Sequence, residues 1–226
     1  MFLTKDNHIK WKFLGAAGGI VAALCFAGAL GLDRPIYNFL HQFNWQIWNA
    51  VAVISDEKVW LAGSFIIAAI IFIKKEAKTK QKQSEITNKF NFRQIIVNFI
   101  EKSKDNKAFL IFCSIALSCV VAAVLKFGFG RMRPVFYEAL GRTGFYPFTN
   151  DWAFNSLPSG HTAASFAGLV MLGLLFPKIK PATWTIAVVV GLSRVMAGAH
   201  WASDVLLGAF IGMVAADVVF RLKSKN

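Results

Sequence analysis

Long apolar stretches, separated by charged or aromatic segments, alternate along this chain of 226 residues. Six of them approach the roughly 17–20 apolar residues that an α-helix needs to cross a hydrocarbon layer about 30 Å thick. The pattern therefore predicts an all-α, polytopic membrane protein with about six transmembrane helices, in a single domain over residues 1–226. The predicted spans are Phe13–Leu32, Val59–Ile73, Ala108–Leu125, Thr162–Phe176, Thr183–Ala199 and Ser203–Phe220.

Two segments between the predicted spans carry aromatic residues among polar ones. Tyr37–Ser55 holds Trp and Phe side chains that suit headgroup depth, so we expect either an interfacial helix or a simple loop with a few membrane anchors. Phe127–Pro158 is punctuated by Gly and Pro, which predicts an outer loop over a site at the membrane surface. Its basic residues Arg131, Arg133 and Arg142 stand among aromatic residues and suit a cap over a lipid headgroup.

Charged breaks mark the ends of predicted spans. Asp33, followed by an Arg and a helix-breaking Pro, is expected to end the first span. The long break over Lys74–Asn106 is Lys-rich at first and amphipathic over Phe90–Ile100. This pattern predicts a basic cytoplasmic loop at about residues 74–107 that includes a surface helix. We assign neither feature to the chemistry of the protein.

Composition and charge set the protein class and its orientation. Hydrophobic residues form 56% of the chain and charged residues 16%, against roughly 25% charged residues in soluble domains. The net charge of +13 is concentrated in segments that share one side of the membrane if the spans alternate. By the positive-inside rule that side is the cytoplasm, so both termini are expected there. Such a basic face suits a lipid bilayer as partner and argues against nucleic acid. Lys and Ile usage and the compact length indicate a bacterium, so we expect the protein in a bacterial inner (plasma) membrane.

Three short motifs in the last hundred residues carry the candidate chemistry. In the predicted topology, the third span ends at the first motif, the fourth span starts at the second, and the last two spans meet at the third. All three motifs are therefore expected at the same outer boundary, on the periplasmic or extracellular side. The motifs are Lys126-x6-Arg133-Pro134, Pro158-Ser159-Gly160-His161 and Ser193-Arg194-x5-His200-x3-Asp204.

The basic residues of these motifs suit a phosphate group. A transferring phosphoryl group spreads negative charge over its oxygens, so cations and positioned donors dominate its catalysis. Lys126, Arg133 and Arg194 supply the cations, although any one of them alone would more often be a charge at a membrane edge. Ser159-Gly160, at the start of a predicted helix, adds backbone N–H donors and the positive end of that helix.

Two histidines and an acid complete the candidate site. His200 and Asp204 are four residues apart, so one helical turn places both on the same face, where the carboxylate can fix the imidazole tautomer. His200 is then the candidate nucleophile, and His161 the candidate general acid for the leaving oxygen. Because the acidic residues expected outside lack the spacing of metal ligands, we predict an enzyme that needs neither a metal nor another cofactor.

The combined pattern resembles the signature of the type 2 phosphatidic acid phosphatase superfamily, and the predicted spans are similar to its integral-membrane lipid phosphatase branch. All three motifs match that signature without substitution. The resemblance implies that His161 is the acid, His200 the nucleophile and Asp204 its orienting partner. It further implies that the phosphate is held by Lys126, Arg133, Ser159, Gly160 and Arg194.

These residues predict a membrane lipid phosphatase that hydrolyses a phosphomonoester or pyrophosphate at the outer face through a phosphohistidine. The expected substrate is undecaprenyl diphosphate or a similar lipid, such as phosphatidylglycerophosphate, phosphatidic acid or a lipid A phosphate, with no obligate protein partner. A lipid phosphotransferase, with lipid A as an example of an acceptor, would use the same residues and stays an alternative. A transporter or channel is disfavoured because its ionisable residues would lie near the bilayer midplane. An idle scaffold is disfavoured because every motif residue is intact.

Overall fold

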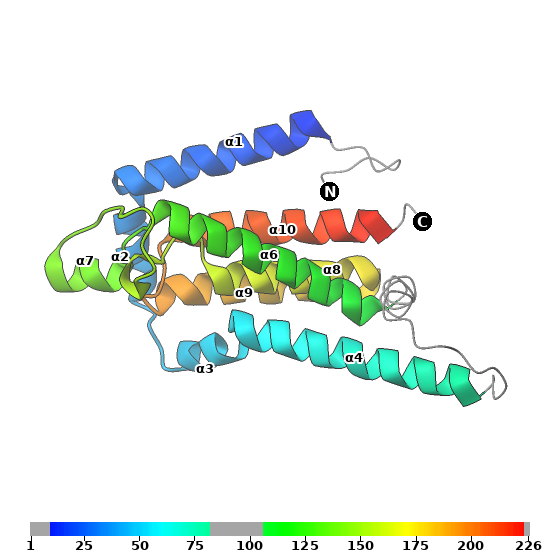
Figure 1. Cartoon of the computed structure of the whole chain (residues 1–226). Helices are drawn as coiled ribbons and strands as arrows, with labels where there is room; N and C mark the ends of the chain where they lie inside the picture. Colours follow the sequence, from blue (N-terminus) through cyan, green and yellow to red (C-terminus); the bar gives the residue numbers. More distant parts are fainter. Residues whose placement is uncertain (1–9, 82–105, 224–226) are drawn as a thin grey trace.

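The computed structural model describes residues 10–81 and 106–223, which form helices joined by short turns and one long loop (Figure 1). These two ranges contain no β-strand, only an isolated bridge between Arg131 and Phe145. The predicted all-α class is therefore confirmed. The helices are α1 Trp11–Ala27, α2 Asp33–His41, α3 Ile47–Ile54, α4 Glu57–Gln81, α6 Lys107–Phe129, α7 Pro134–Leu140, α8 Gly160–Leu175, α9 Lys180–Met196 and α10 Ala202–Lys223.

Four helical segments are long and apolar enough to cross a membrane, and they coincide with four of the predicted spans. The other two predicted spans correspond to α4 and α8. α4 continues through the start of the predicted linker to Gln81, and α8 is apolar but has only 16 residues. The number of helices that cross the membrane therefore stays a prediction. The four segments are Trp11–His41, Lys107–Phe129, Pro177–Met196 and Ala202–Lys223.

The helix α8 forms the centre of the bundle, because it packs against α6, α9 and α10 and is buried along most of its length. Two glycines of α10 allow close contact with it. A Cβ atom at Gly208 would lie 2.6 Å from the carbonyl oxygen of Ser159, and one at Gly212 would lie 2.5 Å from that of Ala163. Without side chains at these positions, α10 lies directly on the backbone of α8.

The first apolar span ends just before Asp33, as predicted, but it ends in a bend at Gly31, and a further helix starts at Asp33. After α1 the chain bends through a π-helical turn at Gly28–Leu32 and continues as α2. Gly31 permits the bend, since its φ of 139° is a conformation that other residues rarely adopt. Asp33 consequently lies in a buried contact and only 2% of its surface is exposed.

Two further expectations concern the segments between spans. Tyr37–Ser55 is helical over most of its length, in the end of α2 and in α3, so it is not a simple loop. Its depth in the membrane stays a prediction. Of the predicted basic loop at 74–107, the first residues belong to α4. Most of the rest, including the predicted surface helix at Phe90–Ile100, lies outside the described residues.

The predicted outer loop folds over the helix ends that carry the motifs. It begins where α6 is capped by Gly130, whose φ is 58°, and a Cβ atom there would collide with the carbonyl oxygen of Tyr146. The chain then turns back on itself, and the Met132 N–H donates to the Gly144 carbonyl oxygen at 2.9 Å. Figure 1 shows α7 and α2 at the same end of the bundle, opposite the start of α1 and the end of α10.

Candidate active site

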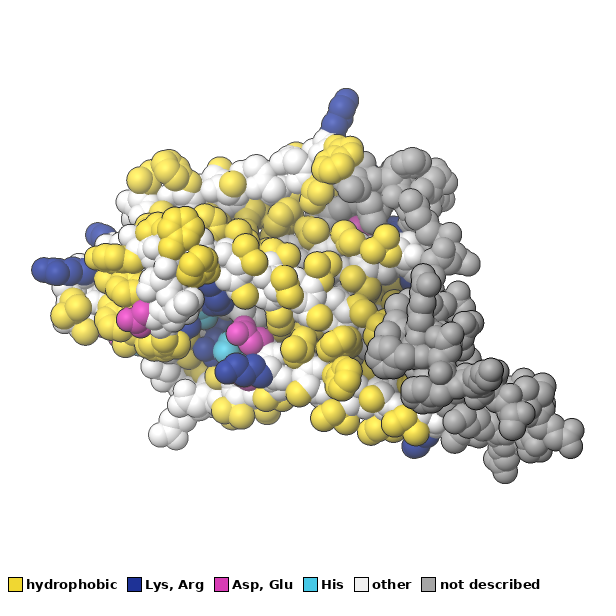
Figure 2. All heavy atoms as spheres, in the orientation of Figure 1, with side chains coloured by type: hydrophobic (Ala, Val, Ile, Leu, Met, Phe, Trp, Pro, Cys, Tyr) yellow, Lys and Arg dark blue, Asp and Glu magenta, His cyan; other side chains and the backbone are white. Residues whose placement is uncertain are grey.

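The three motifs meet at one end of the bundle, as the predicted topology requires. Lys126 lies in the last turn of α6, His161 in the first turn of α8 and Arg194 in the last turn of α9. His200 occupies the turn between α9 and α10, and Asp204 the first turn of α10. Figure 2 shows basic, acidic and histidine side chains gathered at one place on an otherwise largely apolar face.

The turn at Ser159-Gly160 starts α8 and contributes backbone groups to the site. The Ser159 hydroxyl caps the helix by accepting from the backbone N–H of Thr162 at 3.4 Å and from its hydroxyl at 2.9 Å. The Ser159 N–H donates to the Asp204 carbonyl oxygen at 3.0 Å, which ties the turn to α10. A Cβ atom at Gly160 would collide with the Glu57 carboxylate. Glycine therefore allows an anionic group to rest against the N-terminus of α8.

Two of the predicted cations are anchored by backbone carbonyl groups, most of them in the outer loop. Lys126 Nζ and Arg133 Nη2 both donate to the Asn155 carbonyl oxygen, at 2.7 and 3.4 Å. Arg133 also donates to the carbonyl oxygens of Trp152, at 3.0 Å, and Ala199, at 3.1 Å. Burial lowers the pKa of Arg133 to about 10, which leaves the guanidinium charged at neutral pH. These contacts hold both positive charges at the site.

The third cation, Arg194, has buried donors without partners. Its residue surface is only 7% exposed, and among the described residues its Nε and Nη1 groups find no hydrogen-bond acceptor. A buried donor without a partner costs about 1–3 kcal/mol. A guanidinium offers these donors as a planar fork that matches two oxygens of a phosphate. The side chain is therefore arranged to bind an anion.

A backbone carbonyl holds His200 in one tautomer. Its Nδ1 lies 2.8 Å from the carbonyl oxygen of Ser156, which can only accept a hydrogen bond, so Nδ1 carries the proton. Burial lowers the pKa of His200 well below its usual value, and Asp204 offsets only part of this shift. The ring is consequently neutral at physiological pH, and the lone pair of Nε2 is available as a nucleophile.

Asp204 holds the residues around His200 in place. Its Oδ2 lies 3.6 Å from His200 Nδ1, a distance that suits an ion pair but exceeds a hydrogen bond. The carboxylate accepts from the Trp201 backbone N–H at 2.9 Å and from the Ser156 hydroxyl at 2.5 Å. Its other oxygen lies 2.6 Å from Arg131 Nη1. Asp204 thus holds both the turn that carries His200 and the residue whose carbonyl fixes its tautomer.

Arg131 is not part of a cap over a headgroup, which corrects the prediction. Its guanidinium is buried and bridges Asp204, at 2.6 Å, and Asp33, at 2.7 Å. Although burial by itself lowers the pKa of Arg131, the two carboxylates raise it above its usual value. Two buried carboxylates require a cation, and one planar fork reaches both. Nothing in the motifs indicated this ion-pair cluster, and the only signal was Asp33, an acid at the end of the first apolar span.

His161 lies at the mouth of the site, with a side chain that is 19% exposed. Its Nε2 is 3.5 Å from Oδ2 of Asp56, the residue that precedes α4. The positive charges of Arg194, Lys126 and Arg133 also act on the ring. The predicted general acid therefore stands between three cations and a carboxylate.

The donor set of the site suits an anion and not a metal ion. All eight residues predicted from the motifs lie at this end of the bundle, and three of them are basic. Within residues 10–81 and 106–223, no three His, Cys, Asp or Glu side chains are arranged to hold a metal. A phosphate group fits the charges and donors present.

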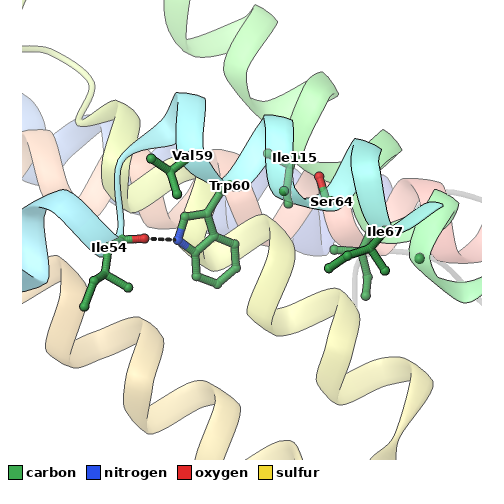
Figure 3. A pocket seen from close by; sticks show the side chains of 9 residues that line it. Ile54, Val59, Trp60, Ser64, Ile67 and Ile115 are labelled. Atoms are coloured by element: carbon green, nitrogen blue, oxygen red, sulfur yellow. Dashed lines mark hydrogen bonds between the residues drawn. The ribbon is translucent and has the colours of Figure 1, made fainter. Parts of the chain in front are cut away.

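An apolar groove of about 350 Å³ begins near the site, between α4 and α6 (Figure 3). Its lining starts at Ile54 and Val59, on either side of the acidic pair at the start of α4, and continues past Gly63. Trp60 is held at this end, because its indole N–H donates to the Ile54 carbonyl oxygen at 2.9 Å. Ile54 and Val59 are more than half exposed, so the groove opens to the outside of the bundle.

The model of the PAP2 superfamily matches residues 107–226, which include all three motifs. The chain belongs to the PAP2 superfamily. A lipid A 1-phosphatase from Rhizobium etli is 38% identical over 102 residues, which cover 45% of this PAP2 chain and 44% of that protein. One from Porphyromonas gingivalis is 36% identical over 107 residues, which cover 42% of this chain and 21% of the relative. The alignments thus span less than half the length of these curated relatives.

A crystal structure of LpxE from Aquifex aeolicus resembles this PAP2 protein in fold. The comparison gives a TM-score of 0.52 and 20% sequence identity, and it covers 83% of this chain and 93% of that one. At this identity the likeness supports the fold alone. Together with the long apolar helices, the family makes this chain an integral membrane protein.

Proposed function

We propose that this PAP2 protein is a metal-independent lipid phosphatase that transfers the phosphoryl group of a membrane lipid to His200 and then to water. One observation carries the proposal: the unpartnered donors of buried Arg194 belong to the same site as a neutral histidine whose Nε2 is free of a proton. A phosphate ester satisfies those donors and presents phosphorus to that nitrogen.

The reaction would proceed in two steps. In the first, Nε2 of His200 forms a bond to phosphorus while the bond to the leaving oxygen breaks, and His161 gives that oxygen a proton. In the second, His161 takes a proton from the water that attacks phosphorus, and the bond to His200 breaks. The three basic residues stabilise the charge on the phosphoryl oxygens in both steps. Asp204 favours the positive charge that develops on His200.

The apolar groove supports a lipid as the substrate. It begins near the phosphate site, is lined almost entirely by apolar side chains and opens to the outside of the bundle, where a membrane protein meets acyl chains. A lipid whose phosphate reaches Arg194 could therefore lay one chain between α4 and α6.

Among lipid phosphates, lipid A 1-phosphate is favoured by the names of the Rhizobium etli and Porphyromonas gingivalis relatives. The sequence alone favours undecaprenyl diphosphate, and the site does not distinguish the two lipids, because both present a phosphoryl group on an apolar anchor. We therefore keep both in the proposal, with lipid A 1-phosphate first. Hydrolysis at the outer face of a bacterial inner membrane is part of the same proposal.

The deciding experiment is phosphate release by the detergent-purified full chain in excess EDTA. The lipids are lipid A 1-phosphate, undecaprenyl diphosphate, phosphatidylglycerophosphate and phosphatidic acid. We expect release from at least one lipid, unchanged by the chelator. Loss of activity in EDTA that a divalent cation restores would contradict the metal-independent mechanism. Phosphate that leaves the first lipid only when a second lipid is present, and that appears on that lipid, would identify a phosphotransferase instead.

Asp204→Asn is expected to reduce phosphate release by about ten- to a hundredfold, less than the loss of His200 itself. The Asn side chain removes a negative charge near the imidazole, but the Ser156 carbonyl still holds Nδ1 and Asp33 still pairs with Arg131. The measurement is kcat for Asp204→Asn and His200→Ala side by side, with melting temperatures. A larger loss in Asp204→Asn than in His200→Ala would reverse the roles assigned here.

Gly63→Leu tests the groove as the site of an acyl chain. A Cβ atom at Gly63 meets nothing within 4 Å, and Leu favours a helix more than Gly, so the protein should fold normally. The larger side chain fills the groove and should raise KM for a long-chain lipid phosphate about tenfold. Turnover of p-nitrophenyl phosphate, which has no acyl chain, should not change. Gly15→Leu in α1, where a Cβ atom also meets nothing, is the matched control. Equal KM values in both variants would exclude the groove.

A further inference from the structure

The two carboxylate oxygens of Asp56 contact different parts of the protein, the start of α4 and the active site. It precedes the first residue of α4, and its Oδ1 accepts from the backbone N–H of Lys58 at 2.8 Å, as an N-cap does. Its Oδ2 faces the other way and lies 3.5 Å from Nε2 of His161 on α8. The cap holds the carboxylate in place, so the second oxygen is presented to the histidine by a fixed side chain.

The electrostatic surroundings of His161 indicate what the Asp56 carboxylate does for this histidine. Burial disfavours the imidazolium and lowers the pKa of His161. The positive charges of Arg194 from α9, Lys126 from α6 and Arg133 from the outer loop lower it further. A general acid must nevertheless carry its proton before the leaving oxygen needs it. Asp56 is the carboxylate at ion-pair distance from the ring among the described residues. The neighbouring Glu57 lies against Gly160 instead.

We propose that Asp56 is a positioning residue that favours the doubly protonated form of His161 and directs its Nδ1 proton at the leaving oxygen. The inference rests on the phosphatase function proposed above. With Nε2–H held by Asp56, the Nδ1 proton passes to the leaving oxygen as the bond from that oxygen to phosphorus breaks, and the ring becomes neutral. In the second step, Nδ1 recovers a proton from the attacking water, and the imidazolium forms again beside Asp56.

Two simpler roles for Asp56 make different predictions. A residue that only caps α4 would change stability and leave the pH profile alone. A residue that only balances the charge of Arg194, on which it also acts, would change phosphate affinity and therefore KM equally for every phosphate ester. A partner of the general acid affects kcat, and only for leaving groups that need a proton.

The test compares Asp56→Asn with Asp151→Asn in the detergent-purified full chain. Asn caps helices about as well as Asp, so both variants should keep the fold while losing one charge. Asp151 is the matched control, since its Oδ1 caps the short helix at Trp152–Phe154 by accepting from Ala153 N–H at 2.9 Å. Melting temperature, kcat and KM are measured for the lipid phosphate of highest turnover and for p-nitrophenyl phosphate, whose leaving group departs without a proton.

For Asp56→Asn we expect the alkaline limb of the kcat profile on the lipid to move to lower pH by about one unit. The direction follows because loss of a negative charge lowers the pKa of the imidazolium, so the acid loses its proton at lower pH. At a pH above the alkaline limbs of both the wild type and Asp56→Asn, kcat of the variant on the lipid should be about tenfold below that of the wild type. The kcat on p-nitrophenyl phosphate should change less than twofold. In a His161→Ala background, Asp56→Asn should add no further loss.

Several outcomes would overturn the inference. These are an unchanged alkaline limb in Asp56→Asn, an equal loss on both substrates, a change confined to KM, or a loss that adds to that of His161→Ala. Failure of the proposed function looks different, because the wild-type protein would then release no phosphate from any of the lipids. An active wild type with an unaffected Asp56→Asn variant would refute the role of Asp56 alone.

Discussion

His200→Gln is expected to lower lipid phosphate release by at least about three orders of magnitude while the protein stays folded. Glutamine can offer an N–H to the Ser156 carbonyl that now accepts from His200 Nδ1, so the local hydrogen bond has a replacement. It has no nitrogen lone pair comparable to Nε2, so the bond to phosphorus cannot form. The measurement is single-turnover and steady-state phosphate release, with the melting temperature recorded beside it.

Two controls separate lost chemistry from lost binding. The cations predicted to bind phosphate are intact in His200→Gln, so inorganic phosphate should raise the melting temperature of the variant as much as that of the wild type. Brief exposure of the wild type to substrate labelled in the phosphate should leave acid-labile label on the protein, and the variant should carry none. A variant with near-normal turnover, or with the same label, would refute His200 as the nucleophile.

Arg131→Met is expected to be the most destabilising single change at this end of the bundle, at about 3–5 kcal/mol. The substitution keeps an apolar stem but leaves Asp33 and Asp204 buried without the cation that pairs with both. A buried carboxylate without a partner must take up a proton or rearrange, and either outcome weakens the native state. Thermal unfolding of the detergent-solubilised protein measures the effect.

A matched surface variant and a rescue test the ion-pair cluster directly. Arg142 is exposed in the same loop, so Arg142→Met should change the melting temperature little. If buried charge is the cause, Asp33→Asn should restore part of the stability of Arg131→Met, because it removes one of the unpaired charges. A double variant that is less stable than Arg131→Met would show that Arg131 acts through packing instead.

The convergence of the motifs was predictable because it depends on a simple property of membrane helices. Each crossing reverses the direction of the chain, so the end of one span and the start of the next lie at the same boundary. Lys126, His161, Arg194 and His200 follow this rule without correction. The residue types then predict a phosphate site, since cations, a helix start and a histidine–acid pair have few other uses together.

The neighbours of those residues were not predictable from the motifs. Arg131 and Arg133 are two positions apart in the same aromatic loop, yet the first is locked into an ion-pair cluster and the second binds loop carbonyls. Spacing placed Asp204 beside His200, and the two lie 3.6 Å apart. The group that fixes the tautomer is instead the Ser156 carbonyl, and every residue type carries such a carbonyl.

The sequence by itself determined the all-α membrane class, the end of the bundle where the site lies and the side chains that meet there. These follow from hydropathy, from helical period and from residue chemistry, all of which act over a few neighbouring positions. Only the tertiary structure decided that Arg131 pairs with Asp33 and Asp204, which are 98 and 73 positions away along the chain. It also decided that Asp56 faces His161. The reason is that a buried charge takes whichever partner packing brings within reach, and packing joins segments whose separation along the chain carries no local pattern.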